Sequence, residues 1–192
     1  RIILAHHIIM TFYGHWPPND PRGTGSLDFY DNKFEPLGPI HHGRKPPEEQ
    51  PSREELHKYH KQVKPLLNFP IFWLNDATRQ VVADAIREVV RKNRYTCYAC
   101  AICSNHLHLV IRKHRDSYEE MWAHLAREIK HRLVASHLVV GGAAINEHHP
   151  VISQRPYAVF LYTRDEIRGR INYAESNPEK EGLPRQHYDF VT

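Results

Sequence analysis

Cysteine is scarce in this 192-residue sequence, and the number of cysteines is odd. The three that occur are Cys97, Cys100 and Cys103. An odd, small number argues against a disulfide framework and favours a reducing compartment. Long apolar runs are missing as well: none approaches the roughly 18 residues of a membrane span, and no secretory signal is visible. These absences predict a globular protein of the cytoplasm.

Internal repeats and low-complexity tracts are also missing, and the composition is that of a globular rather than a disordered chain. With 41% hydrophobic and 25% charged residues, the chain can bury a core, and its length suits a single domain over residues 1–192. The net charge of +4, with 16 histidines besides, is compatible with a polyanionic partner.

A stretch rich in proline and glycine, at about residues 14–51, has no hydrophobic period. Loops of this length are uncommon in compact domains and are usually functional or mobile. Its cations, among them Arg22, could contact phosphates, although a solvated insertion explains the same composition. A second extended segment, a C-terminal tail, is expected from about residue 178, where Pro178 ends the last helix.

The remaining sequence alternates between strand and helix patterns. Capping boxes begin helices at Ser52, Ser117 and Thr163, and Asp76 or Asn75 begins another. Gly141 and Gly142 break the chain, and a loop is expected from there through Tyr157. The expected order is a strand at 1–13, helices at 52–63 and 76–93, a hairpin of strands at 95–103 and 106–113, and helices at 117–136 and 164–177.

The cysteine spacing Cys-x-x-Cys suggests a zinc site, but the strand assignment argues against it. In a regular strand, residues three apart point to opposite faces, so Cys97 and Cys100 could not share an ion. We therefore expect the three cysteines to be small core residues.

The strand at 106–113 contains the first candidate for chemistry, His106-Leu107-His108. Alternate residues of a strand share a face, so the two imidazoles lie roughly 6–7 Å apart on one side and can converge on one metal ion. The apolar residues between them face the core and hold the backbone in place. A chance His-x-His pair is the alternative in a chain with this many histidines.

The last helix contains the second candidate, Tyr173. On a helical wheel the core stripe is formed by Ile167, Ile171 and Ala174. Tyr173 lies about 120° away from this stripe, on a flank that it shares with Arg170 and Asn177. The phenol is therefore beside a cation and a carboxamide, outside the core.

Phosphoryl chemistry gives the two motifs a joint meaning. A divalent ion on His106 and His108 would polarise a phosphate, and Tyr173 would attack it to form a covalent phosphotyrosine. Asn177, four residues after the tyrosine, could complete the metal site with its oxygen. A covalent phosphotyrosine retains the energy of the phosphodiester, which suits strand transfer better than hydrolysis.

The helix at 117–136 has a basic side opposite its apolar side. Arg127, Lys130 and His131 lie there at spacings of three and four residues. A solvated helix face and a track for DNA phosphates are both consistent with this pattern.

These motifs resemble those of the single-tyrosine transposases of the HUH (His-hydrophobe-His) superfamily, and most closely the REP-associated tyrosine transposases. The segment Asn105–Leu109 is similar to the family's His-hydrophobe-His strand, with Ser104 where proline is common. Tyr173–Pro178, followed by Gly182-Leu183, resembles the nucleophile helix. The opening stretch, through Gly23, looks like the family's first strand and loop.

The resemblance implies a ferredoxin-like (RRM-like) α+β fold, an antiparallel sheet with helices packed on one face. It implies Mg²⁺ or Mn²⁺ on His106 and His108, with Asn177 at the third ligand position. The substrate would be single-stranded DNA, recognised near a hairpin, and Tyr173 would form a 5′-phosphotyrosine and release a 3′-hydroxyl. Arg170 would join the basic residues named above in binding DNA. The protein would act as a monomer or homodimer.

Other functions remain open from the sequence. A domesticated transposase could bind nucleic acid on the same fold without catalysis. A metal-dependent hydrolase could use Tyr173 only to position water. Relaxases and rolling-circle initiators of the same superfamily more often carry a third histidine or a paired tyrosine, and no Tyr-x-x-x-Tyr motif is present.

Overall fold

The computed structural model describes residues 1–24, 31–140, 143–154 and 157–192, so the predicted break at Gly141 and Gly142 lies outside the described residues. The chain forms two compact units, one of residues 1–12 with 73–192 and one of residues 13–72. The insertion predicted at about 14–51 lies inside the second unit. Within the described ranges, every helix is too short or too polar to cross a membrane.

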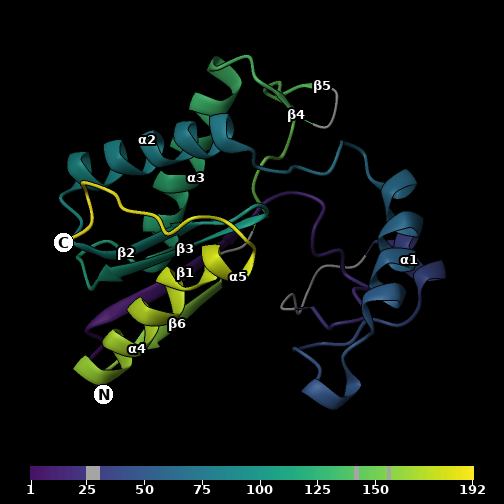
Figure 1. Cartoon of the computed structure of the whole chain (residues 1–192), viewed down its shortest axis with the longest axis horizontal. Helices are drawn as coiled ribbons and strands as arrows, with labels where there is room; N and C mark the ends of the chain where they lie inside the picture. Colours follow the sequence, from purple (N-terminus) through teal and green to yellow (C-terminus); the bar gives the residue numbers. More distant parts are fainter. Residues whose placement is uncertain (25–30, 141–142, 155–156) are drawn as a thin grey trace. The chain divides into compact units, whose positions relative to one another are not determined.

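A four-stranded antiparallel sheet forms the centre of the first unit (Figure 1). Its strands are β1 (Ala5–Thr11), β2 (Cys97–Ile102), β3 (His106–Arg112) and β6 (Tyr157–Leu161), in the spatial order β2-β3-β1-β6. Helix α2 (Asp76–Asn93) connects β1 to β2, and α3 (Tyr118–Ala135) lies between β3 and β6. This β-α-β-β-α-β order is the ferredoxin-like topology, so the predicted α+β class is confirmed.

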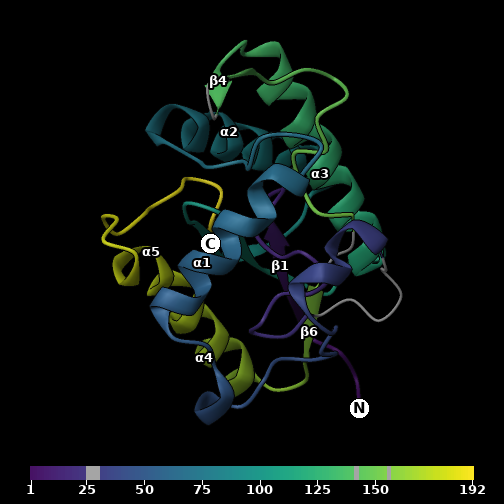
Figure 2. The same cartoon turned by 90° about the vertical axis from the view of Figure 1, so that its right-hand side faces the viewer.

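The register of β1 against β3 assigns side chains to the two faces of the sheet. Ile8 pairs with Leu109 and Ile9 with His108, and alternate residues point to opposite sides. One face carries the buried apolar residues Ile8, Met10, Leu107, Leu109 and Ile111. Helices α2 and α3 cover this face, as expected, whereas α4 (Arg164–Glu175) lies against the other face (Figure 1, Figure 2).

Helix α4 is held to its face of the sheet by the apolar stripe that the helical wheel predicts. Ala174 is buried in a cluster with Val110 and Leu161 of the sheet, and Ile167 and Ile171 pack against the same cluster. Full burial of an isoleucine contributes about 1.5–3 kcal/mol, so these partly buried residues contribute a share of that. The helix is therefore fixed on the sheet face that also carries His106 and His108.

The predicted capping boxes form at the starts of the helices. At Ser117 and Thr163 the hydroxyl accepts the N–H of a glutamate three residues later, and the glutamate accepts the N–H of the cap. Ser52 does the same at α1 (Arg53–Val63) in the second unit. Asn75, rather than Asp76, caps α2, with its oxygen accepting from Thr78.

The structure corrects the prediction for the cysteines. Strand β2 has a bulge between Cys97 and Ala99, so that Cys97 pairs with Ile111 and Cys100 with Leu109. The extra residue places Cys97 and Cys100 on the same face, whereas a regular strand would separate them. All three cysteines are buried and free, as expected of core residues. Burial raises the pKa of the Cys97 thiol to about 12.

Strand β6 is a second difference, because the sequence placed Tyr157 in a loop. The segment Tyr157–Leu161 pairs with β1, with Val159 opposite His7. It contains only apolar and aromatic residues, three of them of strong strand preference, and this composition was the signal for a strand. The strand is short, and its pairing partner β1 lies some 150 residues away in the sequence. The local pattern alone therefore did not distinguish it from a loop.

The C-terminal tail runs along the outer edge of β2. The side chain of Gln186 bonds both the N–H and the carbonyl of Ile102, at 2.7 and 2.8 Å. Asp189 pairs with Arg87 and Arg91 of α2, each at 2.8 Å. The tail thereby occupies backbone groups that an edge strand would otherwise expose.

Short elements complete the two units. The second unit contains 3-10 helices at Asn32–Leu37, Pro47–Glu49 and Lys64–Leu66, and a small core of Phe34, Tyr59 and Val63. Its turn at Gly23 has φ +92°, and a Cβ there would lie 1.9 Å from the carbonyl oxygen of Gly43, so only glycine fits. The first unit contains the two-residue strands β4 (Val139–Val140) and β5 (Ala143–Ala144) and the short helix α5 (Asn177–Lys180).

Candidate active site

Strand β3 presents His106 and His108 on the face that α4 covers. Their ring centroids lie 4.8 Å apart with the planes nearly perpendicular. Leu107, between them, points into the opposite core and is fully buried. The sequence motif therefore yields two adjacent imidazoles on a rigid strand, one of them (His108) only 2% exposed.

Each of these imidazoles has its Nδ1 atom engaged by a neighbour. Nδ1 of His106 donates to Oδ1 of Asn105 at 2.6 Å, which leaves its Nε2 with the lone pair. Nδ1 of His108 lies 3.0 Å from Nε2 of His7, a fully buried residue of β1. Nε2 of His108 is buried and has no hydrogen-bond partner in the structure.

The electrostatics of the site keep these imidazoles neutral at pH 7. Burial, together with smaller effects from the neighbouring His106 and His7, lowers the pKa of His108 to about 3. Burial lowers the pKa of His7 to about 4, with a smaller effect from Arg170. Burial also lowers the pKa of His106. Neutral imidazole is the form that binds a metal ion.

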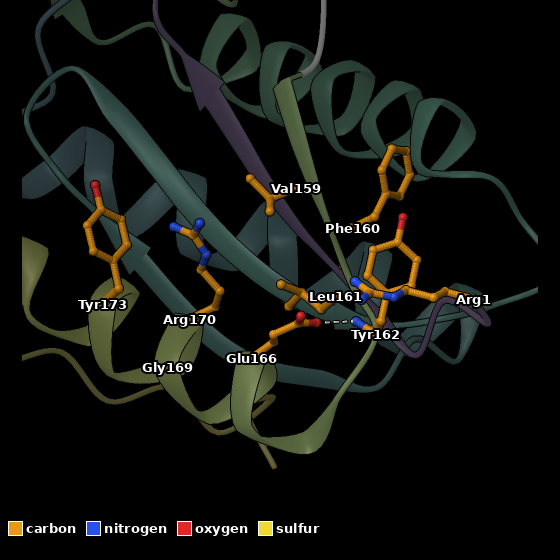
Figure 3. Close-up of a pocket in the computed structure, with 9 residues that line it drawn as sticks. All are labelled: Arg1, Val159, Phe160, Leu161, Tyr162, Glu166, Gly169, Arg170 and Tyr173. Atoms are coloured by element: carbon orange, nitrogen blue, oxygen red, sulfur yellow. Dashed lines mark hydrogen bonds between the residues drawn. The ribbon is translucent and has the colours of Figure 1, made fainter. Parts of the chain in front are cut away.

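Helix α4 places Tyr173 over the histidines. Its ring contacts the rings of His108 and His7 edge-on, with centroids 5.5 and 5.9 Å apart. Two cations lie beside the same ring, Nζ of Lys180 at 4.9 Å and the guanidinium carbon of Arg170 at 5.7 Å from its centroid. The ring is 40% exposed, so the phenol can be reached from solvent. Figure 3 shows the hydroxyl pointing away from the helix.

Asn177 begins α5, one turn after the tyrosine. Its Nδ2 donates to the carbonyl of Tyr173. This bond orients the amide and leaves Oδ1, the atom that a metal ion would bind, outside it.

Two residues near the histidines were missed in the sequence. His7 lies in the predicted opening strand, and only the register of β1 against β3 brings it to His108. Glu181 lies close to Cys103 and His106. Each of the three residues offers one atom that could bind a metal ion, and these atoms are within 4.8 Å of one another. No local pattern pointed to Glu181, because the prediction ended the last helix at Pro178 and expected an extended tail from there. The structure corrects this: Pro178 lies in the first turn of α5, where proline is tolerated, and Glu181 caps the end of that helix.

Glu181 is held by Ser104. Its Oε2 accepts the backbone N–H of Ser104 at 2.9 Å and also the serine hydroxyl. Proline, common at this position in the family that the motif resembles, has no N–H to donate. The other oxygen, Oε1, lies 3.8 Å from Nδ1 of His106.

The donor set fits a divalent cation. Neutral imidazoles, an amide oxygen and a carboxylate are ligands of such ions, and the unpartnered Nε2 of His108 is a buried polar atom that an ion would satisfy. The thiol of Cys103 fits less well. Burial raises its pKa to about 12, with the charge of Glu181 adding to the effect, so it is protonated at pH 7.

The predicted DNA-binding residues lie in different places. Arg170 is at the tyrosine, whereas Arg127, Lys130 and His131 are on α3, which covers the opposite face of the sheet. Arg127 and Lys130 line a shallow hollow of about 360 Å³ with the half-buried Trp122. The structure thus separates these α3 side chains from Tyr173 by the thickness of the sheet.

Arg22 lies in the second unit and is already engaged there. Its guanidinium bonds both oxygens of Asp20, at 2.8 and 2.7 Å, and lies 3.7 Å above the ring of Trp16. A bidentate ion pair with stacking of this kind orders a loop. Arg22 therefore has a local structural role besides any contact with DNA.

No family model matches the sequence, and no curated protein matches it. Comparison with solved structures, however, finds a similar fold. The chain shares the fold of a REP-associated tyrosine transposase. That transposase was solved bound to a REP hairpin, and the match has a TM-score of 0.50 and 12% sequence identity over 96% of this chain and 73% of the other. At this identity the likeness shows the fold alone.

Proposed function

We propose that this protein is a metal-dependent transposase that cleaves and rejoins single-stranded DNA through a covalent phosphotyrosine. One observation carries the proposal: the accessible Tyr173 lies edge-on against the ring of His108, whose buried Nε2 has no hydrogen-bond partner. A phenol, two neutral imidazoles and two cations close together are suited to phosphoryl transfer from a phosphodiester to a tyrosine. The shared fold with a hairpin-bound tyrosine transposase supports it.

In this proposal His106 and His108 hold Mg²⁺ or Mn²⁺ through their Nε2 atoms, with Asn177 contributing Oδ1. The bound ion would withdraw charge from the oxygens of the phosphate. Arg170 and Lys180, which flank the tyrosine ring, bind the phosphate beside it. Glu181, held by Ser104 close to His106, adds a negative charge that favours a cation there.

In the chemical step Tyr173 is the only residue that forms a covalent bond to the DNA. The phenol gives its proton to solvent water and its oxygen bonds to phosphorus, while the bond from phosphorus to the 3′ oxygen breaks. The departing oxygen takes up a proton and becomes a 3′-hydroxyl, and the 5′ side of the DNA stays on Tyr173. A later 3′-hydroxyl reverses the step and joins the strands, without an external energy source.

All of these groups belong to one chain, so one copy is sufficient to build the site. The oligomeric state, monomer or homodimer, stays open. The cations of α3 would contact DNA at a distance from the cleaved phosphate, for example the stem of a hairpin, because the sheet lies between. The cytoplasmic location expected from the sequence stays a prediction.

His7 has a defined part in this proposal. A metal on Nε2 of His108 requires the proton on Nδ1, which must then donate to Nε2 of His7, 3.0 Å away. We expect His7→Phe, which keeps an aromatic ring but has no acceptor, to weaken Mn²⁺ binding about 10–100-fold. Calorimetric Mn²⁺ titration measures this, and His7→Gln, which retains an acceptor oxygen, should recover part of the affinity. Equal Mn²⁺ affinity in wild type and His7→Phe would show that His7 does not support metal binding by His108.

The proposal is tested by a covalent-adduct assay. Labelled single-stranded DNAs that contain hairpins are incubated with protein and Mn²⁺ and run on a denaturing gel, with and without chelator. We expect a protein-linked DNA band that the chelator removes. Cleaved DNA without an adduct would indicate a hydrolase, and DNA that binds but is never cleaved would indicate a non-catalytic binding protein.

A further inference from the structure

A cleft runs between α4 and strand β6 and ends at Tyr173 (Figure 3). Its volume is about 500 Å³, within the range of about 300–1,000 Å³ typical of ligand sites. Val159, Leu161 and Tyr162 line one side, with Arg1 beside Tyr162. Glu166, Gly169, Arg170 and Tyr173 line the other side, along successive turns of the helix.

Gly169 is the least expected residue in this lining. It lies in the interior of α4, where glycine is unfavourable compared with almost any other residue. A Cβ added at Gly169 would meet nothing within 4 Å, so packing within the protein does not require a glycine. Close approach of a ligand to the helix backbone does account for it.

The walls of the cleft have the chemistry of a site for single-stranded nucleic acid. The half-buried Tyr162 offers an aromatic face, with the guanidinium of Arg1 5.9 Å from its centroid, and Arg170 supplies a second cation. Aromatic rings that stack on bases, combined with cations that follow the backbone, characterise such sites.

The one acidic side chain of the lining is already engaged. The carboxylate of Glu166 accepts the backbone N–H groups of Tyr162 and Thr163 as part of the cap of α4. These N–H groups partly neutralise the charge of Glu166, and the bond to Tyr162 holds the backbone of Tyr162 in place beside the cleft. Among the residues that line the cleft, no free carboxylate therefore competes with a phosphate for Arg1 and Arg170.

We propose that this cleft binds the nucleotide that flanks the cleaved phosphate, with its base against Tyr162 and its phosphate at Arg170. The proposal rests on the function proposed above, because it takes single-stranded DNA as the substrate. It goes further by assigning a path: the strand lies along α4, passes over Gly169 and reaches the hydroxyl of Tyr173 at the end of the cleft. The glycine is then a determinant of DNA binding.

The test measures the binding of a fluorescent single-stranded oligonucleotide next to a hairpin, with chelator present so that no cleavage occurs. Gly169→Leu should weaken binding at least tenfold, because leucine fills the cleft yet suits a helix interior. Gly169→Ala, which adds one methyl group, should weaken it less. Asn172→Leu is the matched control, since it adds the same side chain to an exposed position of α4 outside the cleft lining.

A second measurement places the base itself. An oligonucleotide with 5-iodouracil beside the cleavage position should crosslink to Tyr162, and Tyr162→Ala should remove the crosslink. Unchanged affinity in Gly169→Leu, with the crosslink elsewhere, would overturn the cleft while leaving a transposase that still forms its adduct. A wild-type protein that binds no single-stranded DNA would overturn both the cleft and the proposed function.

Discussion

Replacing Tyr173 with phenylalanine is expected to abolish the covalent protein–DNA adduct and to leave DNA binding within about twofold. Loss of a nucleophile typically lowers the rate by a factor on the order of 10³ or more. Phenylalanine keeps the ring contacts with His7 and His108 and the contacts of the ring with Arg170 and Lys180. Only the attacking oxygen is lost. The adduct band on a denaturing gel and fluorescence anisotropy with the same DNA measure the two effects.

The matched control for this experiment is Tyr188→Phe. Tyr188 is the other tyrosine near the end of the chain, but its hydroxyl donates to Gln186 at 3.0 Å and its ring stacks on Phe190. Burial raises its pKa well above the usual range, which disfavours the attacking phenolate. We expect full adduct formation in Tyr188→Phe. An adduct that survives in Tyr173→Phe and disappears in Tyr188→Phe would reassign the nucleophile.

Removing either imidazole of the pair is expected to have the second largest effect. His106→Ala and His108→Ala should each weaken Mn²⁺ binding at least about 100-fold and reduce adduct formation to background, because two of the few ligands of the ion come from these residues. His106 is the cleaner position, since its side chain is partly exposed and its removal leaves a smaller cavity. Mn²⁺ titration and the adduct assay, with denaturant unfolding to confirm the fold, measure the outcome.

The control here is His148→Ala, an exposed histidine on another segment. The result that would contradict our assignment is specific. If His108→Ala binds Mn²⁺ normally while Cys103→Ser and Glu181→Gln do not, the ion belongs to the group of Cys103, His106 and Glu181. A thiolate ligand would then favour zinc over Mg²⁺ or Mn²⁺.

Much of the fold could be predicted because its signals are local. The three Ser/Thr capping boxes, the apolar stripe of α4 and the alternation around His106 each depend on residues a few positions apart, and the structure contains all of them. Features that depend on pairing between distant segments were not predictable in this way. The bulge in β2 shifts the cysteines by one position, and no local pattern indicates where an extra residue is accommodated.

In the candidate site, too, the features that depend on local sequence could be predicted, and those that depend on pairing between distant segments could not. The helical wheel gave the flank of Tyr173 and Arg170, and the structure places both on one cleft. His7 required the register between β1 and β3, two strands that are about 100 residues apart. The cations of α3 formed a clear face on the wheel, but a wheel cannot tell which side of a sheet a helix covers. That information comes only from the topology.

The tail along β2 also limits how copies of this protein could join through their sheets. In the sheet order of the described residues, β6 is the strand at the other end, and only β1 pairs with it. A sheet with two open edges can add neighbours on both sides and grow into a fibre, whereas a sheet with one open edge can only pair with a second copy and stop. Residues 186–192 therefore cover the β2 edge, so that no second copy can add a strand there. The edge that stays open is the one that lines the cleft, where an incoming DNA strand would compete with any such pairing.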